Sequence, residues 1–228
     1  MKISLLTALL FTFAVIDVQL THAQGTGVYL SDVSGFPIRP ATSNGEVSGT
    51  PFLNRDWQLA SVKLKSGKTY KNMHLKLNLL DHNFVFEGDA GQTMGFTEPV
   101  ESVIFDATMS HESPMVFRSG FKGGVVKETD FLEVIADGSA QALKMTSIAV
   151  KEVKDYGSAV TEKSYVTKSA YYINKKDKTL QTISLNKKDI SKVLADHSKE
   201  VELFISENKL NFKKDEDLRS VMHYYNSL

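Results

Sequence analysis

The chain of 228 residues contains no cysteine. This absence excludes disulfide bonds, thiolate metal sites, cysteine nucleophiles and a lipid attached through an N-terminal thiol. Stability must therefore come from a packed core. The length and the 42% share of hydrophobic residues suit one domain, or one domain with an appendage.

The chain also lacks a net charge, because 27 basic residues are balanced by 27 acidic residues. A balanced chain has no global field that would steer it to nucleic acid or to anionic lipid. The phosphate-binding loop, the dinucleotide glycine pattern and the Gly-x-Ser-x-Gly elbow are absent as well. We therefore expect no nucleic-acid partner and no cofactor.

Only one apolar run is long, and it spans residues 3–16, after a lysine at position 2 and before Asp17. A helix that crosses a bilayer needs roughly 20 apolar residues, so this run is too short. With the small residue Ala23 behind it, the pattern predicts a cleaved signal peptide at 1–23. The alternative is a buried first strand or helix. We expect export to the periplasm or the extracellular space, and no transmembrane span in the mature chain.

Residues 24–50 are rich in Gly, Ser, Thr and Pro. Pro37 and Pro40 disfavour regular strand pairing nearby, and the glycines add backbone entropy to the unfolded chain. This composition predicts a loosely ordered lead-in, with 28–30 as its one short edge strand.

From residue 51 to 186 the pattern is that of antiparallel strands. Apolar residues recur at every second position of 57–106 and are separated by turn residues. In 69–80, for example, Leu75, Leu77 and Leu79 share one face, and His74 lies on the other. We count nine or ten strands and no βαβ rhythm. The prediction is an antiparallel β-meander that forms a curved sheet or an open barrel.

Residues 187–228 change to a helical period. They contain three apolar stripes, with Ser198 as the expected cap of the second helix and acidic residues at 215–217 in the first turn of the third. Helices this short need a partner surface, and the sheet is the expected one. The fold class is α+β, mainly β, with a C-terminal group of short helices docked on the sheet. The stripes are Ile190, Val193 and Leu194; Val201, Phe204 and Ile205; and Leu218, Val221, Met222 and Tyr225, with Arg219 and His223 on the solvent side of the last.

Two blocks of sequence carry a family resemblance. The first is GTPFL at 49–53 with LKSGKTY at 64–70, and the second is NKLNFK at 208–213 with YYNSL at 224–228. Together they resemble a group of uncharacterised exported β-rich proteins of Bacteroidota-type bacteria, from residue 49 to the C-terminus. The resemblance implies export across the inner membrane, and it brings no known activity with it.

Residues that could carry chemistry are scattered. The six histidines form no His-Glu-x-x-His pair, and the nearest approach to a metal set is His74 and His82 with Asp81, which we interpret as solvated surface. The Ser-x-x-Lys pattern of penicillin-recognising enzymes opens a buried helix there, but here it falls in a turn, a strand and a helix end. Its three occurrences are Ser119 with Lys122, Ser184 with Lys187, and Ser206 with Lys209.

Two charged clusters have a structural and a functional interpretation. The acids at 215–217 could bind a cation, but first-turn acids of a helix usually stabilise the helix. The lysines could contact lipid headgroups, although a solvated surface is the simpler interpretation. They are Lys175, Lys176, Lys178, Lys187, Lys188 and Lys192.

These observations assign no catalytic, cofactor-binding or metal-binding residue. They favour an exported, non-catalytic binding or structural protein of the cell envelope, whose partner is an envelope protein or a small ligand. One alternative is an apolar-ligand carrier with a cavity in the curved sheet, which a cavity lined by Leu and Phe would favour. Another is a hydrolase, which needs two carboxylates roughly 5–10 Å apart in one cleft. The candidates for it are Glu87, Asp89, Glu98 and Glu101.

Overall fold

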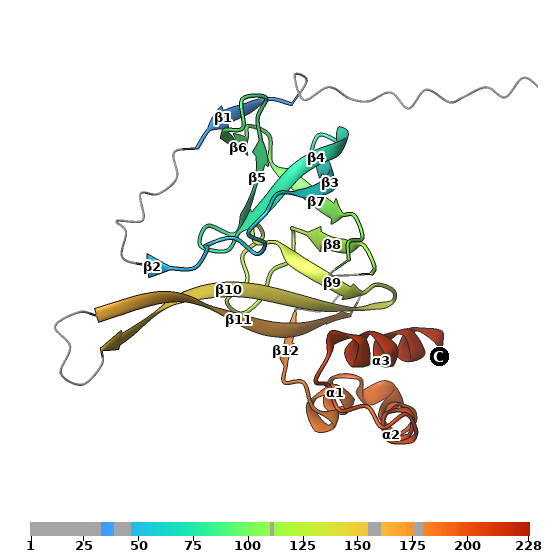
Figure 1. The fold of residues 1–228 in the computed structure, drawn as a ribbon. Helices are drawn as coiled ribbons and strands as arrows, with labels where there is room; N and C mark the ends of the chain where they lie inside the picture. Colours follow the sequence, from blue (N-terminus) through green and yellow to red (C-terminus); the bar gives the residue numbers. More distant parts are fainter. Residues whose placement is uncertain (1–32, 39–46, 110–111, 155–160, 176–179) are drawn as a thin grey trace, which may run out of the picture.

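The computed structural model of the chain describes residues 33–38, 47–109, 112–154, 161–175 and 180–228. The predicted signal peptide at 1–23 and the predicted strand at 28–30 lie outside these residues. The described part consists mainly of strands, and its helices lie at the C-terminal end (Figure 1), which confirms the predicted α+β class.

One large sheet contains all the described strands, and its ends do not pair with each other within the described residues. The order is β1-β6-β5-β4-β3-β7-β8-β9-β10-β11-β12, and β2 pairs with β11 in parallel. The strands are β1 (Gly35–Pro37), β2 (Val47–Ser48), β3 (Gln58–Leu64), β4 (Thr69–Asn78), β5 (Asn83–Glu87), β6 (Thr93–Phe96), β7 (Val100–Phe105), β8 (Met115–Arg118), β9 (Leu132–Ala136), β10 (Ala140–Lys154), β11 (Thr161–Lys175) and β12 (Gln181–Ile183).

The topology departs from a simple meander at β7. This strand does not continue beyond β6 but returns to pair with β3, so β3 lies in the middle of the sheet. Strands β4, β5, β6 and β1 lie on one side of β3, and β7 to β12 lie on the other. Neighbouring strands are antiparallel throughout this order, as predicted, whereas the place of β7 is set by a pairing that no local pattern reveals.

The predicted leucine row of β4 is confirmed, because Leu75, Leu77 and Leu79 are all at most 3% exposed. The alternation breaks nearer the start of the strand, where Tyr70 and Met73 both face the core. A register shift against β3 takes up the extra residue, and Asn72 adopts a positive φ of 56° there. Asparagine tolerates this conformation better than most residues, which suits it to the bulge.

Part of the lead-in, residues 33–38 and 47–50, lies within the described residues. Residues 35–37 form β1 on β6, although Pro37 was expected to prevent pairing. β1 is the outermost strand on its side of the described sheet. Proline is tolerated in an edge strand, because the position that lacks an N–H can face away from the neighbouring strand, where no hydrogen bond of the sheet is lost. The prediction for Pro37 was therefore wrong, since it treated an edge position as an interior one.

The C-terminal segment contains α1 (Lys187–Val193), the 3-10 helix η2 (Ala195–His197), α2 (Ser198–Glu207) and α3 (Asp215–Ser227). Ser198 does not cap α2, because it already has helical angles of −60° and −38°, and His197 takes the cap position. A side-chain cap occurs at α1 instead, where Asn186 Oδ1 accepts a bond from the Asp189 N–H at 2.9 Å. No helix of the described residues has the length and apolarity needed to cross a bilayer.

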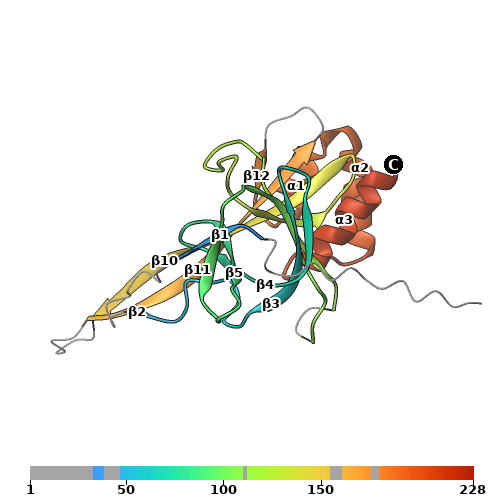
Figure 2. The same ribbon diagram turned by 90° about the horizontal axis from the view of Figure 1, so that it is seen from above.

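The helices pack on the sheet around β9 and the base of the long β10–β11 hairpin (Figures 1 and 2). The α3 stripe is buried as predicted, with Leu218, Val221 and Met222 all at 0% exposure. It shares a core with Ile135 of β9 and Ile173 of β11. A separate core fills the β3–β7 half of the sheet and is rich in phenylalanine.

Candidate functional site

Three of the four acids considered for a hydrolase are bound to basic side chains. These contacts join neighbouring parts of the β3–β7 half of the sheet, and Asp89 lies exposed between β5 and β6. Such exposed ion pairs contribute little to stability and place no two of these acids against each other. The contacts are Glu87 Oε2 with His74 Nδ1 at 2.8 Å, Glu98 Oε1 with Lys68 Nζ at 3.3 Å, and Glu101 Oε1 with Lys63 Nζ at 2.8 Å.

His74 and two of the motif serines are likewise engaged in other contacts. His74 contacts Glu87, and among the described residues no three His, Asp or Glu side chains gather closely enough for a metal ion. His111 lies outside the described residues. Ser119 Oγ donates to the carbonyl of Val100 at 3.1 Å, and Ser206 Oγ donates to the carbonyl of Glu202 at 2.7 Å. Neither hydroxyl is thus arranged as a nucleophile beside its motif lysine.

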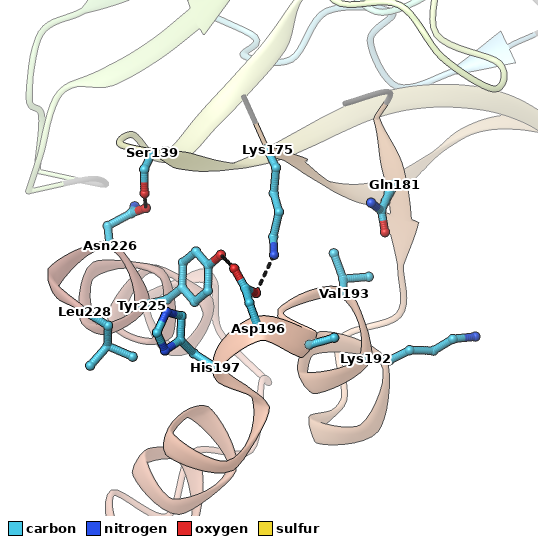
Figure 3. Close-up of a pocket in the computed structure, with 11 residues that line it drawn as sticks. Ser139, Lys175, Gln181, Lys192, Val193, Asp196, His197, Tyr225, Asn226 and Leu228 are labelled. Atoms are coloured by element: carbon cyan, nitrogen blue, oxygen red, sulfur yellow. Dashed lines mark hydrogen bonds and ion pairs between the residues drawn. The ribbon is translucent and has the colours of Figure 1, made fainter. Parts of the chain in front are cut away.

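A polar cavity of about 630 Å³ lies between the base of the β10–β11 hairpin and the helices. Three side chains from different elements meet there (Figure 3): Lys175 from β11, Asp196 from η2 and Tyr225 from α3. Lys175 Nζ lies 2.6 Å from Asp196 Oδ1, and the Tyr225 hydroxyl donates to Asp196 Oδ2 at 2.7 Å. The ammonium also lies 5.1 Å from the centre of the Tyr225 ring.

The protonation states of this triad are fixed by mutual contact. Burial raises the pKa of Asp196, but the bonds from Lys175 and Tyr225 outweigh it and lower that pKa to about 2. Burial lowers the pKa of Lys175, but the contacts with Asp196 and Tyr225 together outweigh it, so the net change is upward. Burial raises the pKa of Tyr225. None of the three is therefore poised to exchange a proton near neutral pH, and the triad acts as a latch between hairpin and helices.

The latch of Lys175, Asp196 and Tyr225 makes the stability of the fold decrease at acid pH. Because the pKa of Asp196 is about 2 in the folded chain and about 3.9 unfolded, its contribution is complete above about pH 4 and is lost as the pH falls towards about 2. We expect Asp196→Asn to lower the melting temperature at pH 7 and to flatten its decline between pH 4 and pH 2. Thermal melts of both proteins across this range measure the effect. Parallel pH profiles would contradict it.

A second polar cluster fastens α3 to the sheet. Asp215 Oδ2 accepts a bond from Lys144 Nζ at 2.7 Å, and Asp215 Oδ1 accepts one from the Tyr171 hydroxyl at 2.7 Å. Burial raises the pKa of the neighbouring Glu133 and of Tyr171. Asp215 is thus committed to contacts within the protein. Asp215, predicted from sequence to stabilise the helix as a first-turn acid, also holds it against the sheet.

Two further side chains of α3 make bonds that the sequence did not predict. Asp217 Oδ2 accepts bonds from the backbone N–H groups of Asn211 and Phe212, at 3.0 and 2.7 Å. Arg219 was expected on the solvent side, but its Nε donates to the Ile135 carbonyl of β9 at 2.9 Å. The stripe prediction was wrong for Arg219, since a long side chain reaches the sheet from a position beside the stripe.

The lysines that the sequence grouped into one cluster have different environments in the structure. Lys175 belongs to the latch, and Lys187 Nζ donates to Ser206 Oγ at 2.8 Å. Lys188 and Lys192 are exposed at α1, and Lys176 and Lys178 lie outside the described residues. The described lysines therefore do not form one uncommitted basic surface.

A smaller pocket of about 220 Å³ lies in the other half of the molecule, and its walls are mostly apolar. Phe84 of β5 and Phe131, one residue before β9, belong to the buried core beneath it, with ring centres 4.7 Å apart at 78°. Val100, at the start of β7, completes this inner wall. Since all three are at most 9% exposed, the inner end of the pocket rests on rigid, packed side chains.

The outer wall of this aromatic pocket is formed by β1 and β6, from Phe36, Ile38 and Phe96. β1 is fixed by a bond from the Ile38 N–H to the Thr93 carbonyl at 2.9 Å. Phe36 crosses over Gly95, where a Cβ atom would come within 2.8 Å of its ring. A glycine at position 95 therefore lets the Phe36 ring approach the strand closely, and yet Phe36 remains 53% exposed.

Sequence reasoning did not identify either pocket. The chain matches no known protein-family model, no curated protein and no solved structure.

Proposed function

We propose that this chain is an exported, non-catalytic binding protein of the cell envelope that holds a small apolar group in the aromatic pocket. The observation that carries the proposal is the pocket itself, with walls of Phe36, Phe84, Phe96 and Phe131. An apolar cavity of about 150 Å³ is known to bind benzene. A pocket of about 220 Å³ has room for one ring, or a branched alkyl group, with a short substituent.

The chemistry of the larger cavity supports the non-catalytic part of the proposal. Its carboxylate, ammonium and phenol are bound to one another, and none titrates near neutral pH. A general acid or base works best with a pKa near the operating pH. Export rests on the sequence pattern of residues 1–23, which is typical of a signal peptide.

This proposal refines the carrier alternative raised by the sequence. The cavity is small, and it lies between the β1–β6 edge and the segment that leads from β8 to β9. The C-terminal helices pack at the other end of the sheet and contribute none of its lining residues. The site suits a single side-chain-sized group rather than a long lipid chain.

Calorimetric titration of the chain with a neutral ring, 2-phenylethanol, tests the proposal. We expect saturable binding, and we expect Phe36→Ala to weaken it roughly tenfold, because this change removes the outer aromatic wall. The variant should remain folded, since Phe36 is 53% exposed.

Leu59→Ala is the matched control, because Leu59 is a large apolar side chain with 42% exposure that does not line the pocket. Its affinity should equal that of the unchanged chain. Absence of saturable binding would refute the proposal, as would equal affinities of all three proteins.

A further inference from the structure

In the described part of the chain, a lysine without an acidic partner lies at the mouth of the aromatic pocket, and the binding of an apolar group does not explain it. Lys65 lines the pocket from the turn between β3 and β4. Its backbone N–H donates to the Pro99 carbonyl at 2.9 Å, so the residue is held beside the inner wall at Val100. The side chain is exposed to solvent.

Lys65 differs from the two neighbouring lysines in its ion pairing. Lys63 and Lys68, on either side of it, are each paired with an acid, Glu101 and Glu98. Lys65 has no acidic partner among the described residues. The unpaired charge at the opening is therefore positive.

The acid that borders the pocket is already committed. Glu98 lines the opening, and its pKa is lowered by a hydrogen bond from Ser66 and then by the bond from Lys68. The negative charge of Glu98 is thus already paired with the Lys68 ammonium at 3.3 Å, which weakens its attraction for a ligand cation. A ligand anion, in contrast, can approach Lys65 and complete its pairing.

We propose that the ligand is a small monocarboxylate with an aromatic or branched apolar body, and this rests on the proposed function of the same pocket. The apolar body lies against Phe84, Phe96 and Phe131, and the carboxylate binds the Lys65 ammonium at the mouth. Burial of the apolar body against the core contributes the binding energy, while the lysine orients the ligand and selects for a negative charge.

A series with one ring and three end groups tests this inference on the full chain. Calorimetric titrations with 3-phenylpropionate, 3-phenylpropanamide and 3-phenylpropylamine keep the apolar body and change the charge. We expect the acid to bind about fivefold more tightly than the amide, the upper range for an exposed ion pair, and the amine to bind most weakly. Because the pair is exposed, the preference for the acid should shrink at roughly 1 M salt.

Lys65→Met should abolish the preference, so that the acid and the amide bind with equal affinity. Lys71→Met, another exposed lysine that does not line the pocket, should keep the preference. Equal binding of acid and amide by the unchanged chain, or a preference that survives Lys65→Met, would overturn the inference while leaving apolar binding intact. If none of the three compounds binds, both this inference and the proposed function fail.

Discussion

Leu218→Ala should lower the free energy of unfolding by about 2–5 kcal/mol, because it removes a fully buried side chain and leaves a cavity. Leu218 is 0% exposed in the core that α3 shares with Ile135 and Ile173. A helix of this length has little stability in isolation, so its contact with the sheet is what keeps it folded. Urea denaturation of the two proteins measures the difference directly.

His223→Ala is the matched control in the same helix, because His223 is exposed, and it should cost under about 0.5 kcal/mol. Arg219 does not serve as the control, since it donates to the Ile135 carbonyl. Equal small effects of both substitutions, with fast hydrogen exchange along α3, would show a helix that is mobile in the isolated protein and available to a partner.

Asp215→Ala should destabilise the protein by on the order of 3 kcal/mol, because it leaves Lys144 and Tyr171 without their acceptor. Lys144 is 21% exposed, so its charge is only partly solvated. The remaining acid near it, Glu133, lies 3.9 Å away and has a pKa raised by burial. It compensates poorly for the lost contact at 2.7 Å.

Glu216→Ala separates this effect from the helix dipole. Glu216 occupies the same first turn, but its side chain is 68% exposed and lies 3.7 Å from Arg219. Both substitutions remove a first-turn acid, and the exposed pair of Glu216 with Arg219 contributes little, so the main difference is the contacts of Asp215 with the sheet. The difference between their urea midpoints therefore reports the Asp215 network, and two equal midpoints would assign Asp215 to the dipole alone.

The parts of the fold that the sequence predicts are those determined by local burial. The alternating leucines of β4 and the Leu218 stripe of α3 each follow from neighbouring positions, because one face of the element must be buried. Ser198 shows the limit of such reasoning. The pattern placed it before a helix, while the 3-10 turn at 195–197 moves it inside α2.

The candidate sites could not be predicted, since they depend on residues that are distant in sequence. Asp215 meets Lys144 across 71 positions, and the aromatic pocket brings Phe36 together with Phe131. The position of β1 on β6 and the return of β7 to β3 produce these encounters. Without the pairing of strands, an exposed phenylalanine and a buried one give no sign that they line the same pocket.

Mapping of amide chemical shifts during titration with 2-phenylethanol tests the central claim most directly, because it locates the bound ring as well as detecting it. We predict that the shifts concentrate on β1 and β6 and around Phe84, Val100 and Phe131. We predict none at the latch of Lys175 and Asp196. Shifts confined to the helical end of the molecule, or no shifts at a saturating concentration, would contradict a binding function for the aromatic pocket.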